Sequence, residues 1–165
     1  MQSNSQDKAL WQRLVIAADD LEQAKAFAMH LLNKGWHHHA STRKRSAYFQ
    51  QSAFTTAFVV AYGRVFIKSR GWPSVPDRLA KRTVEQEALH NQILELRNEV
   101  YAHSDVNRQE IRKMDFFGLS IPLKTHQSMH LSREQLILAT QMIVALQKSI
   151  QTRTEQLAEN FAGEA

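Results

Sequence analysis

No cysteine occurs anywhere in the sequence, and this absence excludes several classes of chemistry. A chain without cysteine has no disulfide framework, no thiolate metal site and no catalytic thiol. Apolar runs are also short, because no uninterrupted stretch approaches the roughly 18–20 residues that a membrane-spanning helix requires. Residues 1–8 lack the basic-then-apolar pattern of a signal peptide. These absences predict a cytoplasmic protein that is not inserted in a membrane.

Only three prolines and five glycines interrupt the 165 residues, and the long segments between them carry helical periodicity. Helices are expected at about residues 5–34, 41–68 and 83–102, and from residue 132 onward. Gly35 is placed to end the first helix, while Thr83-x-x-Gln86 and Ser132-x-x-Gln135 have the form of capping boxes that open the last two. The pattern predicts an all-α fold, an antiparallel bundle of four long helices that forms a single domain over residues 1–165.

The expected core follows from apolar residues at helical spacing in these segments. The first stripe consists of Leu10, Leu14, Ala17, Leu21, Ala24, Ala28 and Leu31. The second consists of Phe54, Phe58, Ala61 and Val65, widened by Phe49, Val59, Val60 and Phe66. Such a broad stripe predicts a central second helix. Residues 104–131 do not read as a long helix. Residues 105–113 are compatible with a short helix, and residues 116–131 predict a small hairpin or an irregular arm before the last helix.

Positive charge is in excess, with 21 Lys and Arg against 16 Asp and Glu, a net charge of +5 and a sequence pI of about 9.7. The cations gather in three clusters, at residues 43–45, 64–70 and 78–82. A polyanion such as RNA is therefore an expected partner, and the expected RNA-binding residues are Arg43, Lys44, Arg45, Arg64 and Lys68. The alternative is that each cluster only solvates a helix face. Trp72, beside these cations, is expected to close the end of the bundle or to stack on a base.

The third predicted helix carries the candidate catalytic residues. Leu89, Ile93, Leu96 and Val100 recur at helical spacing, and Arg97 and His103 fall on either side of this stripe. Arginine offers a planar fork of donors that suits phosphate oxygens, and histidine exchanges a proton near neutral pH. This pairing favours cleavage of a phosphodiester without a metal or another cofactor.

The segment LRNEVYAHSD at residues 96–105 resembles sequences of prokaryotic members of the HEPN superfamily. In these proteins an Arg, a polar residue directly after it and a His a few residues later lie at the end of a helix in an all-helical domain. The resemblance implies a metal-independent endoribonuclease, a toxin or phage-defence component whose cleft forms at a homodimer interface. Arg97, Asn98 and His103 match the catalytic motif. An antitoxin protein is an implied partner. Members of the superfamily that are inactivated by adenylylation carry a Tyr two positions after the His. This chain has Asp105 there, which puts regulation by adenylylation in doubt.

In the mechanism expected from this resemblance, His103 acts as general base or acid on the ribose 2′-hydroxyl, and Arg97 neutralises charge on the phosphorane oxygens. Asn98 orients the motif or adds a hydrogen bond. Three alternatives stay open: a noncatalytic HEPN-like helical module that binds RNA or a protein partner, a purely structural dimer, and a motif in which Arg97 and His103 only satisfy buried polar groups.

The other histidines carry weaker expectations. His37, His38 and His39 suggest metal ligation, but adjacent loop residues seldom converge on one ion, so a turn is expected there. His126 and His130 have the i, i+4 spacing of helical ligands in a segment that does not read as helical. His90 precedes Arg97 on the third helix and is expected on the surface. No metal site is expected.

Overall fold

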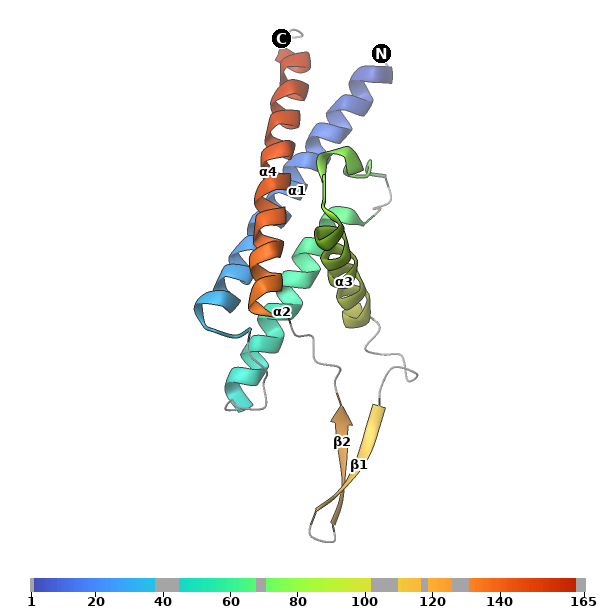
Figure 1. The fold of residues 1–165 in the computed structure, drawn as a ribbon. Coiled ribbons are helices and arrows are strands. Elements are labelled where there is room, and N and C mark those ends of the chain that lie inside the picture. The colour runs from blue at the N-terminus through green and yellow to red at the C-terminus, as the bar shows by residue number, and fades with distance from the viewer. Residues whose placement is uncertain are drawn as a thin grey trace.

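The computed structural model describes residues 2–37, 45–67, 71–101, 110–116, 119–125 and 131–162. The described chain contains four long helices: α1 (Gln2–Asn33), α2 (Arg45–Phe66), α3 (Val84–Tyr101) and α4 (Arg133–Ala162). A short 3₁₀ turn, η2 (Asp77–Leu79), precedes α3. The helical fold class predicted from the periodicity is therefore confirmed (Figure 1).

Each long helix packs against two of the others. α1 and α4 lie side by side and run in opposite directions (Figure 1), and α2 packs against α1. α3 packs against α2 and, less extensively, against α4. None of the described helices is both long and apolar enough to cross a membrane.

Between α3 and α4 the chain forms two strands, β1 (Glu110–Phe116) and β2 (Leu119–Thr125), which project away from the helices (Figure 1). The strands are antiparallel, with Glu110 opposite Thr125 and Phe116 opposite Leu119. A hairpin was one of the two arrangements expected over residues 116–131, and β2 lies in that range. Residues 110–113 belong to β1, so the short helix expected over residues 105–113 is wrong there.

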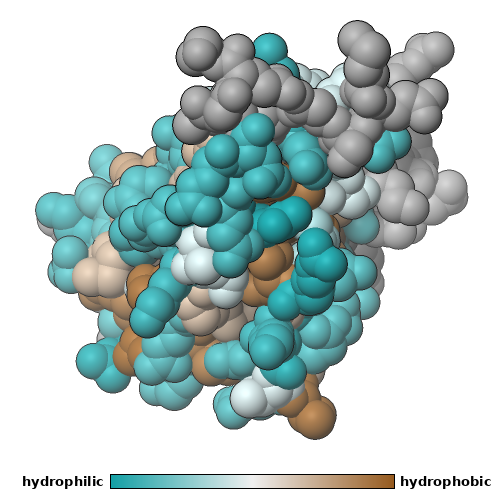
Figure 2. Space-filling view, turned by 90° about the horizontal axis from the view of Figure 1, so that it is seen from above, coloured by the Kyte–Doolittle hydropathy of each residue, from teal (hydrophilic) through white to brown (hydrophobic). Residues whose placement is uncertain are grey.

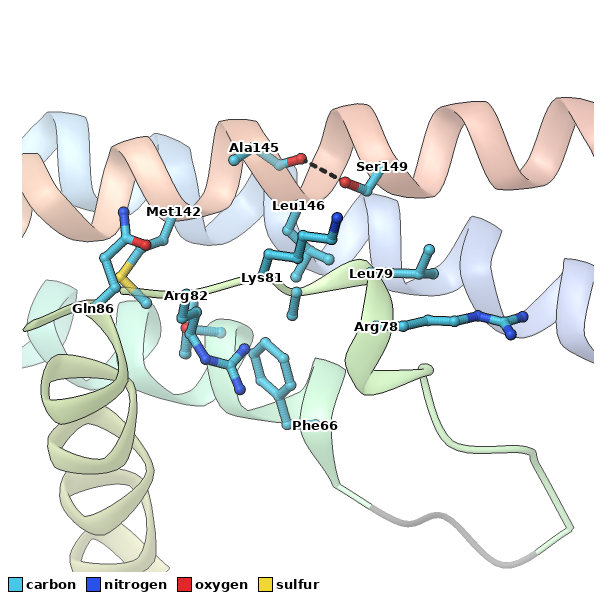
Figure 3. Close-up of a pocket in the computed structure, with 12 residues that line it drawn as sticks. Phe66, Arg78, Leu79, Lys81, Arg82, Gln86, Met142, Ala145, Leu146 and Ser149 are labelled. Carbon is cyan, nitrogen blue, oxygen red and sulfur yellow. Dashed lines mark hydrogen bonds between the residues drawn. The ribbon is translucent and has the colours of Figure 1, made fainter. Parts of the chain in front are cut away.

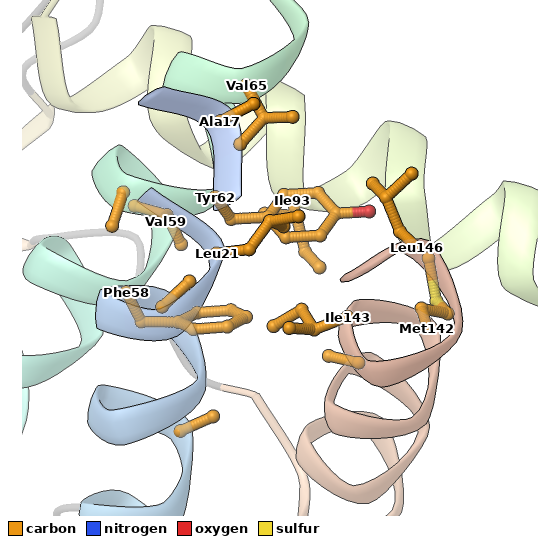
Figure 4. Packing of buried hydrophobic residues seen from close by; sticks show 14 of the residues in the cluster. Ala17, Leu21, Phe58, Val59, Tyr62, Val65, Ile93, Met142, Ile143 and Leu146 are labelled. Carbon is orange, nitrogen blue, oxygen red and sulfur yellow. The ribbon is translucent and has the colours of Figure 1, made fainter. Parts of the chain in front are cut away.

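The core lies where the predicted stripes of the helices meet. In α1, every stripe residue from Leu14 to Leu31 is buried, and in α2 Phe58, Val59 and Val65 are fully buried. Figure 4 shows Leu21, Phe58, Tyr62 and Ile143 from three helices facing one another. Phe49 was predicted to widen the α2 stripe and is instead 56% exposed. In the view of Figure 2, hydrophilic residues cover most of the described surface, and apolar residues show between them.

Local hydrogen bonds set the helix ends as predicted. Gly35 has a φ of 63°, and the amides of Gly35 and Trp36 donate to the carbonyls of Leu32 and Leu31, which is the pattern of a Schellman motif. At the start of α3, the Thr83 amide donates to Gln86 Oε1 (3.0 Å) and the Gln86 amide to Thr83 Oγ1 (3.3 Å). Ser132 and Gln135 form the same box at the start of α4. Both predicted capping boxes are confirmed.

Candidate functional site

Arg97 lies in the C-terminal half of α3 and is half-buried against α2. Its aliphatic stem occupies the space above Gly63: a Cβ at Gly63 would lie 2.9 Å from Arg97 Cγ and 3.4 Å from Arg97 Cβ and Cδ. Ordinary contacts between carbon atoms are about 3.5–4.0 Å. Glycine at position 63 therefore gives the arginine stem its place between the two helices.

The head of Arg97 interacts with the next residue of the motif. Its Nη1 donates to Asn98 Oδ1 at 3.1 Å, and the Asn98 side chain is exposed. The apolar stripe beside them is buried at Leu89 and Ile93 and partly buried at Leu96. Arg97 thus flanks that stripe, and its guanidinium reaches Asn98 on the exposed face of α3.

His103, the third residue of the predicted motif, lies outside the described residues, so its separation from Arg97 stays a prediction. The side chains of Val100 and Tyr101 also lie outside the described part. The alternative in which Arg97 pairs with Glu99 is likewise untested, because the Glu99 side chain belongs to the same undescribed group.

Among the predicted RNA-binding residues, Arg64 is the one whose side chain is described. Its Nη2 lies 2.8 Å from Asp20 Oδ1 and also donates to Gln23 Oε1 (3.1 Å), so it links α2 to α1. Arg43, Lys44 and Lys68 lie outside the described residues, as does the side chain of Arg45, the first residue of α2.

The environment of Asp20 shows why the fold needs Arg64. The carboxyl group is buried, and burial raises its pKa while the charges of Arg64 and Arg13 oppose that rise. Arg13, itself buried, donates through Nη2 to the carbonyls of Arg64 (3.0 Å) and Val65 (2.7 Å) at the C-terminal end of α2. A cation at this end of a helix satisfies open carbonyls and complements the helix dipole. Arg13 and Arg64 therefore stabilise the junction of α1 and α2.

His90 was expected on the surface and is instead 5% exposed, so that expectation is wrong. Tyr62 Oη lies 3.0 Å from His90 Nδ1, and the ring of Phe66 meets the imidazole edge-to-face with centroids 4.5 Å apart. Burial, aided by the charge of Arg82, lowers the pKa of His90 to about 4. Burial also raises the pKa of Tyr62. His90 is therefore neutral at physiological pH and belongs to the core.

Sequence reasoning missed the Tyr62–His90 pair because its two members lie on different helices. The only local signal is that His90 sits three residues before the buried Ile93, at the border of the apolar stripe.

Trp72 was expected mainly to close the bundle end, but it is 41% exposed and does not fill the core.

Within the described residues, no group of three or more His, Asp and Glu side chains is placed to hold a metal ion. His37 is described, whereas His38, His39, His126 and His130 lie outside. Comparisons of the chain with protein-family models, with curated proteins and with solved structures found no match in any of the three.

Proposed function

We propose that the protein is a metal-independent endoribonuclease of the HEPN type, with a composite active site at a homodimer interface. The observation that carries the proposal is the placement of Arg97: its stem is seated on Gly63 and its guanidinium is hydrogen-bonded to Asn98 at the surface of α3. A cation positioned in this way by a neighbouring helix suits electrostatic stabilisation of a phosphorane, since such stabilisation depends on donors that are fixed before the reaction.

In the proposed reaction, His103 removes the proton from a ribose 2′-hydroxyl, and the oxygen attacks the adjacent phosphorus. The bond from phosphorus to the 5′-oxygen breaks, and that oxygen takes a proton from the second histidine of the dimer. The products are a 2′,3′-cyclic phosphate end and a 5′-hydroxyl end. Arg97 stabilises the charged equatorial oxygens, and Asn98 holds its guanidinium through the contact at 3.1 Å.

The assembly is part of this proposal. We propose that the four helices act as an antiparallel bundle and that two copies meet through α3, related by a two-fold axis, so that both motifs face one cleft. A protein of this type acts as a toxin or defence component in the cytoplasm, where an antitoxin partner would restrain it.

The test is incubation of the purified protein with mixed RNA in EDTA. The wild type is expected to cut the RNA, and His103→Ala to lose about 10²–10⁴-fold of the rate, the usual contribution of general acid–base catalysis. His126→Ala, a histidine without a role in the proposal, is the control and should cut at the wild-type rate. Cleavage that survives in His103→Ala would refute the assignment.

Arg97→Lys sharpens the test because lysine keeps the charge and loses the planar fork of donors. The rate of cleavage should fall much more than the affinity for RNA. Arg133→Lys is the matched control, since Arg133 is exposed in the first turn of α4. Cleavage by Arg97→Lys at the wild-type rate would leave Arg97 with a structural role only.

A further inference from the structure

A cavity of about 220 Å³ lies between the segment that leads into α3 and the middle of α4. Its apolar wall is formed by Phe66, Leu79, Met142 and Leu146, and Lys81 extends across it toward α4 (Figure 3). The volume is below the roughly 300–1,000 Å³ of pockets that enclose a drug-sized molecule. A space of this size with an apolar wall suits one planar ring rather than a whole cofactor.

A second, more open hollow of about 520 Å³ continues from this cavity along α4. The two share Arg78, Leu79 and Ser149 in their linings, so they form one groove. We call it the α4 groove. Its polar floor comes from residues spaced along one face of the helix, namely Lys148, Ser149, Thr152, Arg153 and Gln156.

The charges of the α4 groove have one sign. Arg78, Lys81, Arg82, Lys148 and Arg153 line it, and no Asp or Glu is among the described residues of its two linings. Arg82 is held by Glu87, with 2.6 Å between Nε and Oε2, and lies over the Phe66 ring. Arg78, Lys81 and Lys148 are exposed at the rim. Concave walls that carry one sign of charge concentrate ions of the opposite sign.

We propose that the α4 groove binds single-stranded RNA, with phosphates along Arg78, Lys148 and Arg153 and one base in the cavity beside Lys81. Lys148 and Arg153 are five residues apart on α4, about 7–8 Å along the axis, so the cations follow the groove rather than converge on one ion. Basic grooves with apolar or aromatic base sites are the usual design of single-strand binding surfaces. This inference rests on the proposed function, because it names the surface that would hold the substrate.

Arg64 supports the choice of this groove over the predicted α2 surface. Its guanidinium is engaged by Asp20 and Gln23, whereas Lys148 is in no ion pair within the described part of the chain. A phosphate at Arg64 would have to compete with a buried carboxylate at 2.8 Å. A phosphate at Lys148 displaces only water and counterions.

The test measures binding of a short fluorescein-labelled 2′-O-methyl oligouridylate, which lacks the attacking hydroxyl and so reports binding without cleavage. Lys148→Glu/Arg153→Glu is expected to raise Kd by about tenfold or more and to reduce the slope of log K against log salt by about 0.7 per lost phosphate contact. Lys34→Glu/Arg133→Glu is the matched control: it changes the net charge equally, replaces exposed residues, and lies outside the groove. A strand of the same length without bases should bind at least about fivefold more weakly than the oligouridylate.

Three outcomes would overturn the inference: equal Kd values for the two double variants, no binding of the strand by the wild type, or equal affinity for the strand without bases. Binding to anionic vesicles without binding to the strand belongs to the second outcome. A wild type that binds the strand through the groove but leaves RNA uncut supports the α4 groove and refutes the cleavage proposal. RNA cleavage that Lys148→Glu/Arg153→Glu leaves unchanged supports the cleavage proposal and refutes the α4 groove.

Discussion

The contact between Gly63 and Arg97 predicts a stability effect that does not depend on any enzymatic activity. Gly63→Ala places a methyl group 2.9 Å from Arg97 Cγ, well inside the usual contact distance. Cγ lies near the backbone of α3 and is not the mobile end of the side chain. The methyl group therefore forces either the arginine stem or the two helices to move.

Two opposing effects set the magnitude. Alanine in place of glycine inside a helix gains about 0.8–1 kcal/mol, and overpacking a closed contact costs about 1–3 kcal/mol. In the wild-type background we expect Gly63→Ala to lower the free energy of unfolding by roughly 0–2 kcal/mol. In an Arg97→Ala background the Cγ and Cδ atoms are gone, so the same change should raise that free energy by about 0.5–1 kcal/mol.

The assay is urea denaturation followed by far-ultraviolet circular dichroism for the four members of this double-mutant cycle. The coupling energy between the two positions should be about 1–3 kcal/mol. Arg133→Ala combined with Gly63→Ala is the control and should show additive effects, because Arg133 lies on α4. An effect of Gly63→Ala that has the same sign and size with and without Arg97 would refute the packing of Arg97 on α2.

The remaining predictions concern the N-terminal half of α3. Because the pKa of His90 is lowered from 6.5 to about 4 in the folded protein, the unfolded chain binds a proton that the folded chain does not between these values. The stabilisation by neutral His90 is complete above pH 6.5 and is lost as the pH falls toward 4, by at most about 3 kcal/mol. Denaturation at several pH values should therefore show a flatter profile for His90→Gln than for the wild type, and parallel profiles would contradict the burial of a neutral imidazole. Thr83→Ala removes the hydroxyl that accepts from the Gln86 amide and should lower the free energy of unfolding by about 0.5–2 kcal/mol; Thr83→Ser should restore it, and a neutral Thr83→Ala would show that the cap does not form in solution.

Features that depend on neighbouring residues in the chain were predictable from the sequence. The α1 stripe from Leu14 to Leu31 is buried because residues three and four apart share a helix face. The Schellman motif at Gly35 and the box at Thr83 were predictable because each is closed by hydrogen bonds within six residues. Because the interacting residues are close in the chain, their spacing and residue types are enough to predict these features.

Features that depend on contacts between helices were not predictable in this way. His90 looks like a surface residue until Tyr62 and Phe66 of α2 are placed against it. In the sequence Arg64 looks like an RNA-binding or solvated cation, and its ion pair is visible only once Asp20 of α1 is placed beside it. The role of Gly63 is visible only once Arg97 of α3 is seated on it. Periodicity states that a face is buried, but it does not state which polar group the opposing helix brings there.

The environment of His90 also narrows the choice of a catalytic base. Arg97 and His90 lie on the same helix and are two turns apart, so His90, the histidine within α3, is the alternative to His103 as the base for the proposed reaction. A pKa of about 4 makes it a weak base at neutral pH. Its Nδ1 is already in contact with Tyr62 Oη at 3.0 Å, and the ring lies within the core. Using His90 would require opening the packing of α2 on α3, the same packing that seats Arg97 on Gly63. RNA cleavage that depends on Arg97 must therefore draw its base from outside the core, and His103, six residues beyond Arg97, is the histidine that we propose for that role.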